Sequence, residues 1–213
     1  LLGGVTHRFP GLNFGFLEGG VGWACQLFAD LLGHWEKRNV GALADVDPKN
    51  LDEASLLEYA QSFAPSEFTE LMANRSRDIP PERRTIAPAE GLDDFAACGI
   101  SREEDLVNQF VEGFYFGCEA DDPINAWAFR RDNLPHGVQL NTLFGSDIGH
   151  FDVPDMAGVL PEAYELVDDD LIGLDDFRSF VYANAVRFLS KHNRAFFGGT
   201  CLENEVRAFW EAK

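Results

Sequence analysis

The residues best suited to chemistry lie in one stretch, "LFGSDIGHFDVPD", Leu143 to Asp155. An apolar run ends there at a glycine, and Asp147 follows almost at once. A carboxylate directly after a buried strand is held rigidly at a solvent-accessible end, where it can bind a divalent metal or take a proton from metal-bound water. A turn aspartate that caps the following loop has the same pattern. The local sequence leaves both interpretations open.

Two neighbours of Asp147 extend this candidate site. His150 can donate to an anionic substrate group or act as an acid or base, because imidazole changes charge near neutral pH. A lone loop histidine is more often structural, and local sequence alone favours that role. We include His150 as a candidate catalytic residue and the hydroxyl of Ser146 as a candidate substrate contact.

Glu18 is a third candidate catalytic residue. It ends the apolar run "LNFGFLE", and two glycines follow it. A carboxylate on a buried strand is costly unless it meets a cation or hydrogen-bond donors. Glycines permit close approach of the backbone. These features favour a functional carboxylate over a surface one.

A dense acidic set, Glu119, Asp121 and Asp122, follows the apolar segment "FYFGC". These side chains can hold a cation or contact a substrate, and their mutual repulsion would be large without a counter-charge. The alternative is a solvated loop in which Asp122 and Pro123 make a turn. The sequence favours neither interpretation.

Three short apolar segments must position these groups: residues 12–18, 114–123 and 139–147. Each is bounded by turn signals and runs into polar or small residues, which is typical of parallel strands. Residues 23–38 have helical spacing. Further helices are expected over 155–189, with a break near 170–174, and near the end of the chain. Strands linked through helices predict an α/β parallel sheet.

Residues 40–112 differ from the rest and read as a helical insertion. Asp47 and Pro48 predict the start of one helix. A second helix is expected to stop at Pro80 and Pro81. Ser101 and Glu104 have the spacing of a capping box at the start of a third. These helices either cover a site or pad the surface, and padding is the default interpretation.

Composition limits the partners of this chain. It has 213 residues and a formal charge of -19, so we expect no binding to nucleic acid or to anionic membranes. No apolar run is long enough to span a bilayer. The four cysteines show no metal-binding spacing and are expected to be reduced thiols in a cytoplasmic protein. A small-molecule substrate remains the expected partner.

Several motifs together resemble the amidohydrolase-2 branch of the metal-dependent amidohydrolase superfamily, which includes the aminocarboxymuconate semialdehyde decarboxylase relatives. They are "RFPGLNFGFLEGGVGWA", "FYFGCEADDP" and "LFGSDIGHFDVPDM", followed by "VLPEAYELV" and "DFRSFVYANAVRFL". The resemblance covers most of the chain and is weakest over residues 40–112. It implies a (β/α)8 TIM barrel, with residues 12–18, 114–118 and 140–146 as its sixth to eighth strands.

The resemblance also implies the chemistry. The family holds one divalent metal, often zinc, with manganese as a second possibility, at the carboxyl ends of its strands. Asp147 matches the eighth-strand aspartate, which ligates the metal or handles the proton of the attacking water. His150 matches a histidine common in this branch. Where the family has a histidine on its sixth strand, this sequence has Glu18.

The family's His-x-His of the first strand and histidine of the fifth have no counterpart here. Because a catalytic zinc site takes about three protein ligands, Asp147 is expected to depend on ligands from a missing N-terminal part. A barrel needs about 250 residues, so we expect residues 1–213 to be the C-terminal part of one, inactive alone.

Two functions follow as hypotheses. The first is a metal-dependent enzyme that hydrolyses a C–N or C–O bond, or decarboxylates a small carboxylic acid without oxidation. It would work either as a homo-oligomer or with the missing N-terminal half. The second is a non-catalytic, barrel-derived binding or structural protein, or an inactive fragment.

Overall fold

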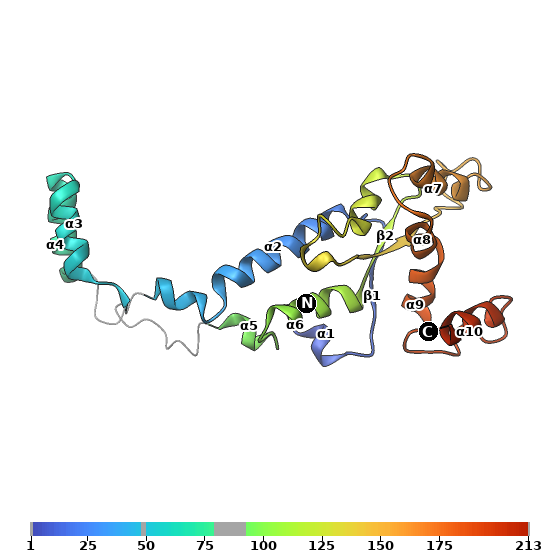
Figure 1. The fold of residues 1–213 in the computed structure, drawn as a ribbon, viewed down its shortest axis with the longest axis horizontal. Coiled ribbons are helices and arrows are strands. Elements are labelled where there is room, and N and C mark those ends of the chain that lie inside the picture. The colour runs from blue at the N-terminus through green and yellow to red at the C-terminus, as the bar shows by residue number, and fades with distance from the viewer. Residues whose placement is uncertain (1, 48–49, 79–92, 213) are drawn as a thin grey trace. The chain divides into compact units, whose positions relative to one another are not determined.

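The computed structural model describes residues 2–47, 50–78 and 93–212, and the chain divides into two compact units (Figure 1). The larger unit combines residues 1–32 with 98–213, and the smaller one comprises residues 33–97. All candidate site residues belong to the larger unit.

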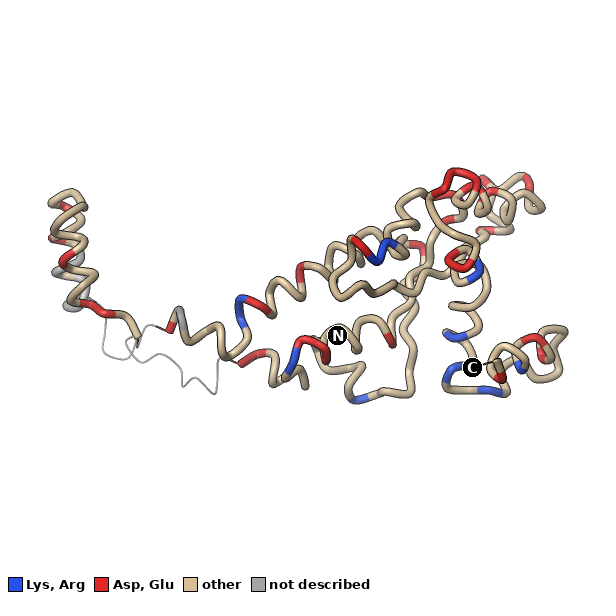
Figure 2. Tube along the Cα trace, in the orientation of Figure 1, with Lys and Arg blue, Asp and Glu red and all other residues tan. Residues whose placement is uncertain are grey.

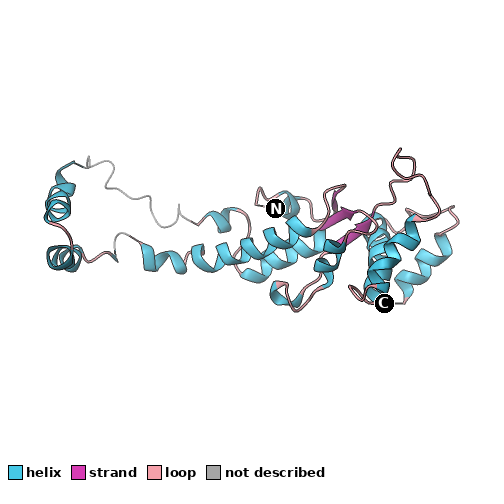
Figure 3. Cartoon of the chain, turned by 90° about the horizontal axis from the view of Figure 1, so that it is seen from above, coloured by secondary structure: helices cyan, strands magenta, loops and turns pink. Residues whose placement is uncertain are grey.

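The larger unit builds a small sheet among helices, as Figure 3 shows. Its strands are β1 (Phe14–Phe16), β2 (Phe114–Cys118) and β3 (Asn141–Phe144). Its helices and helical turns are α1 (Val5–Arg8), the first part of α2 (Gly22–Arg38), α6 (Glu103–Gly113), η5 (Pro123–Phe129), η6 (Pro135–Gly137), α7 (Val159–Asp168), α8 (Leu174–Arg178), the π-helical turn η7 (Ser179–Ala183), α9 (Asn184–Ser190) and α10 (Glu203–Glu211).

The three strands form one parallel sheet in the order β1-β2-β3. Phe14 lies opposite Phe114 in the first pair, and Tyr115 lies opposite Asn141 in the second. The predicted α/β class and parallel pairing are confirmed. All three strands lie within the predicted segments, and each is shorter than its segment.

Burial differs between the centre and the edge of the sheet. All five residues of β2 are buried, as a central parallel strand requires. In β1, however, Phe14 is half-buried and Phe16 is 41% exposed. The prediction of a buried strand over residues 12–18 is wrong, because in the described part of the chain no strand pairs with the outer edge of β1.

Helices cover both faces of the sheet. Phe114 and Phe116 point to one face, where their rings lie 5.6 and 6.0 Å from that of Phe110 in α6. Tyr115 points to the other face, as the alternation of side chains along a strand requires, and its ring lies 5.1 Å from that of Phe188 in α9. Aromatic burial on both sides therefore holds the sheet in place.

A side chain occupies the outer edge of β3. The backbone N–H of Gly145 donates to Cys118 O of β2 at 2.8 Å. Because carbonyls alternate in direction along a strand, Thr142 O, three residues earlier, points away from β2. The buried Asn184 donates its Nδ2 to that carbonyl at 2.9 Å. This hydrogen bond fastens the start of α9 to the sheet. It uses a carbonyl that no strand bonds in the described residues.

The helix predicted over residues 23–38 is confirmed as α2. Ala24, Cys25, Phe28, Leu31 and Leu32 are its buried residues, and they recur at the spacing of one helical face. Lys37 and Arg38 lie in its last turn, where cations interact favourably with the helix dipole.

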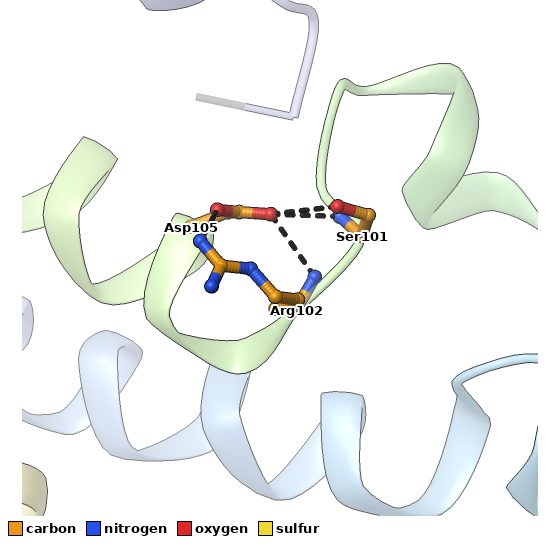
Figure 4. A network of polar contacts seen from close by, with 3 residues as sticks. All are labelled: Ser101, Arg102 and Asp105. Carbon is orange, nitrogen blue, oxygen red and sulfur yellow. Dashed lines mark hydrogen bonds and ion pairs between the residues drawn. The ribbon is translucent and has the colours of Figure 1, made fainter.

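The start of α6 is capped differently from the prediction (Figure 4). The carboxylate of Asp105 accepts hydrogen bonds from Ser101 N at 3.1 Å, Ser101 Oγ at 2.9 Å and Arg102 N at 3.0 Å. Ser101 is therefore a donor in this cap, and the predicted partner Glu104 is wrong. These hydrogen bonds, led by that from Ser101 N, lower the pKa of Asp105 to about 2.

The helices after β3 follow the predicted order. α7 ends at Asp168 and α8 begins at Leu174, which confirms a break near 170–174. Asp170 lies in this break with φ 56°, a left-handed conformation that stops a helix. The predicted last short helix is α10, and its Trp210 donates Nε1–H to Ser190 Oγ at 3.0 Å.

The smaller unit is helical. It contains the end of α2, η1 (Ala42–Val46), α3 (Glu53–Phe63), α4 (Ser66–Asp78) and α5 (Asp94–Ala97). Asp52 caps α3 by accepting from Ser55 N at 3.1 Å, so the predicted start at Asp47 is wrong. The predicted stop at Pro80 and Pro81 lies outside the described residues. Among the described helices, none is long and apolar enough to cross a membrane.

Candidate functional site

The candidate residues share one edge of the sheet. Because the strands are parallel, their carboxyl ends meet there. Gly20 N donates to Gly117 O at 2.9 Å, and Gly145 N donates to Cys118 O at 2.8 Å. The loops after β1 and β3 are therefore both bonded to the end of β2. Figure 2 shows acidic residues gathered along the chain that follows β3.

Asp147 and His150 are brought together by a turn. Asp147 adopts φ 48°, a left-handed conformation that aspartate tolerates better than most residues. Its carbonyl accepts from His150 N at 2.9 Å, and its Oδ2 lies 3.7 Å from His150 Nδ1. The two side chains are 38% and 55% exposed. They form a solvent-accessible acid–imidazole pair that a small shift would convert into a hydrogen bond.

Ser146 lies in the same turn. Its Oγ accepts from Ile148 N at 3.5 Å, at the long limit of a hydrogen bond. The preceding Gly145 permits the turn, because an added Cβ would lie 3.1 Å from Cys118 O. The hydroxyl of Ser146 is therefore held weakly and remains able to bond a ligand.

Glu18 differs from its prediction. It is exposed in the turn after β1, with φ 58°, and is followed by Gly20 at φ 64°. The expectation of a carboxylate on a buried strand is wrong, because β1 is exposed and the chain has already left the sheet at this residue. Glu18 shares the edge with Asp147, but no hydrogen bond or ion pair between them is observed among the described residues.

The acidic set after β2 has divided roles. Asp122 accepts from Ile124 N at 3.0 Å and caps η5, whose first residue is Pro123. This is the geometry of the turn alternative. Glu119 and Asp121 are exposed, and Glu119 O accepts from the buried Asn125 Nδ2 at 2.7 Å. Two of the three carboxylates thus remain exposed beside the edge.

Burial dominates the ionisation of the cysteines near this edge. Burial, and secondly the charge of Asp122, raise the pKa of the Cys118 thiol to about 12. Burial also raises the pKa of Cys25 to about 11. Little thiolate therefore forms on either residue near neutral pH.

Gly117 is a positioning residue that sequence reasoning missed. An added Cβ would lie 2.9 Å from Leu17 Cα and 3.2 Å from Glu18 N. The turn that carries Glu18 therefore packs directly on the backbone of β2. The available signal was a glycine inside a strand, which often marks a close approach of another backbone.

The described donor set does not by itself fit a metal ion. No group of three or more His, Cys, Asp or Glu in the described residues is placed to hold one. Asp147 and His150 offer two donors, whereas a catalytic zinc site takes about three protein ligands. A zinc or manganese site would need ligands beyond these residues.

Helices on both faces of a parallel sheet, with polar loops at the carboxyl ends, occur in many α/β proteins, so this arrangement alone identifies no activity. The assignment to the amidohydrolases is therefore a hypothesis that rests on the sequence motifs. Comparisons with protein-family models, with curated proteins and with solved structures find no match for this chain.

Proposed function

We propose that this chain is part of an amidohydrolase-type barrel enzyme in which Asp147 handles a proton at the reacting centre. The observation that carries the proposal is the position of Asp147. It follows the end of a parallel strand and lies 3.7 Å from an imidazole nitrogen. Such a carboxylate is solvent-accessible yet fixed by a turn, as a general base must be.

The chain's own residues suggest a division of work. Asp147 accepts a proton from the attacking water or from the substrate and later returns it to the leaving group. His150 Nδ1–H donates to Asp147 or to a substrate carboxylate, which orients both. Glu119 and Asp121 border the site, and Ser146 Oγ is a further substrate contact. The reaction is hydrolysis of a C–N or C–O bond, or decarboxylation of a small acid.

The open edge of β1 supports a larger barrel. Leu17 is 69% exposed and Phe16 is 41% exposed beside an apolar groove. The groove is lined by Leu2, Phe16, Trp23, Leu27, Leu31, Phe110, Phe114 and Phe116. A parallel edge strand with an apolar flank can pair with a further strand and pack against a further helix. These additional elements would supply the metal ligands that the described residues lack, and zinc or manganese is the expected ion.

The test is turnover of the full-length protein with small amides, esters and carboxylic acids. Asp147→Asn keeps the size of the side chain and should lower kcat by about 100-fold or more, since it removes a proton acceptor. Asp155→Asn is the matched control, because its exposed carboxylate accepts, among the described residues, a local bond from Ala157 N at 3.1 Å. Undiminished turnover in Asp147→Asn would remove Asp147 from the mechanism.

A non-catalytic binding or structural protein is the second candidate. The exposed position of Glu18, where the family has a histidine, favours it. Calorimetry with zinc on the full-length protein separates the two functions. Stoichiometric zinc binding that weakens in Asp147→Asn supports the enzyme, whereas the absence of zinc and manganese binding and of turnover supports the second candidate.

A further inference from the structure

The helices after β3 divide into an acidic part and a basic part. Residues 132–177 contain no Lys or Arg, whereas residues 178–202 contain no Asp or Glu. Figure 2 shows the acidic residues around α7 and the start of α8, and the basic ones from the end of α8 to the loop before α10. This run of helices therefore carries opposite charges at its two ends.

The basic part is built from arginines that lie over aromatic rings. Arg178 Cζ and Arg187 Cζ lie 5.9 and 5.4 Å from the centre of the Phe209 ring. Arg194 Cζ lies 3.3 Å from the centre of the Trp210 ring. A ring holds the face of a guanidinium and leaves the N–H donors at its edge able to bind a carboxylate.

These donors are almost unused. Arg178 and Arg194 make no side-chain hydrogen bond within the described part of the chain, and Arg187 makes one, from Nη1 to Asn184 Oδ1 at 2.8 Å. None of the three arginines forms an ion pair with a described carboxylate. Three guanidinium groups are thus held in place without a counter-charge.

The acidic part also lacks its counter-charge. Asp168, Asp169 and Asp170 are exposed at the end of α7, whose last turn holds no basic residue. Carboxylates at a helix C-terminus face the negative end of the helix dipole, and adjacent carboxylates repel one another. No ion pair relieves them among the residues that the structure describes. A cationic partner would remove this unfavourable interaction.

We infer that the acidic and basic parts bind each other between two copies of this chain, which forms a twofold-symmetric dimer. A twofold axis across the run of helices would place the acidic part of each copy on the basic part of its partner, so that both contacts form together. Arginine and aromatic side chains are enriched at protein interfaces and among their hot spots. Tyr182 lies in the π-helical turn η7, and such turns are frequent at functional sites.

The net charge of the chain is compatible with this dimer. The repulsion that follows from a formal charge of -19 is screened beyond about 8 Å at physiological ionic strength. Carboxylates paired with guanidinium groups lie well inside that distance, so the local charges decide the contact. The inference concerns residues 159–210 and does not depend on the proposed function.

The test reverses each charged part separately in the full-length protein and measures its mass by sedimentation velocity. Arg178→Glu with Arg194→Glu makes both parts acidic, and Asp168→Lys with Asp169→Lys makes both parts basic. Each double variant alone should have its dimer Kd raised about 100-fold or more, because every contact then joins like charges. An equimolar mixture of the two should dimerise again, because each contact between them joins opposite charges.

A third double variant is the control. Lys37→Glu with Arg38→Glu makes the same charge change as the arginine variant, in the last turn of α2, and should leave the dimer intact. Circular dichroism checks that every variant is folded. The inference would be overturned by an unmodified protein that is monomeric at about 100 μM, by a dimer that persists in either double variant, or by a mixture of folded variants that stays monomeric.

Discussion

The Nδ2 group of Asn184 donates to the backbone carbonyl of Thr142 at 2.9 Å and so covers part of the outer edge of β3 with a helix. The Oδ1 atom of Asn184 accepts from Arg187 Nη1 at 2.8 Å, which fixes the amide. Closure of a barrel at this edge would require the bond to Thr142 to be exchanged for one between strands. Extension of the sheet at β1 requires no such exchange.

Asn184→Leu should lower the free energy of unfolding by about 1–3 kcal/mol, because it leaves the buried carbonyl of Thr142 without its donor. Urea unfolding followed by circular dichroism measures the change. Asn204→Leu is the control, since Asn204 is exposed in α10 and its Oδ1 accepts a local bond from Arg207 at 2.6 Å. Equal stability of the two variants would show that the bond to Thr142 contributes nothing.

Asp105 should make the start of α6 sensitive to acid. Its pKa is lowered in the folded chain to about 2, from an ordinary value of 3.8. The stability that the ionised Asp105 cap adds to the folded chain is therefore fully present above about pH 4 and is lost as the pH falls through about 2. Asp105→Asn should remove this part of the pH dependence, measured by thermal unfolding between about pH 5 and pH 2. An unchanged profile would contradict the assigned cap.

Gly117→Ala should destabilise the chain, because the new methyl would lie 2.9 Å from Leu17 Cα, a backbone atom that cannot rotate away. A loss of about 1–3 kcal/mol is expected. Gly33→Ala, within α2 and with no atom within 4 Å of the added Cβ, should instead stabilise by about 0.5–1 kcal/mol. Urea unfolding compares the pair, and the same sign in both variants would refute the close approach.

The thiols should differ in reactivity. Cys25 and Cys118 are buried with raised pKa values of about 11 and 12, so little thiolate forms at neutral pH. Cys201 is exposed. Brief iodoacetamide treatment of the native chain, read by peptide mass spectrometry, should modify Cys201 first. Early modification of Cys118 would show that the end of β2 opens readily.

The sequence predicts those features that depend on local patterns. The run "FYFGC" indicates a central strand because burial on both faces requires continuous apolar residues. Burial of β1 could not be predicted in the same way, since it depends on whether another strand pairs with its outer edge. The prediction of Glu104 as the capping carboxylate of α6 was also wrong, because Glu104 and Asp105 are adjacent and only the backbone direction decides which of them accepts the hydrogen bonds.

The candidate site could likewise be predicted only where it depends on the local sequence. Asp147 and His150 are three residues apart, so one turn suffices to bring them together, and their spacing was visible in the sequence. The prediction that Glu18 lies on a buried strand was wrong, because its burial depends on neighbours in the tertiary structure.

The open edge of β1 also has a consequence for the behaviour of the chain in solution. In the described residues no strand pairs with this edge, and an edge flanked by the exposed Phe16 and Leu17 is a template for strand pairing between molecules. The formal charge of -19 opposes such association by repulsion between chains. Added salt screens that repulsion while leaving the apolar contact intact. Its colloidal stability should therefore fall as ionic strength rises, so low-salt buffers suit its purification.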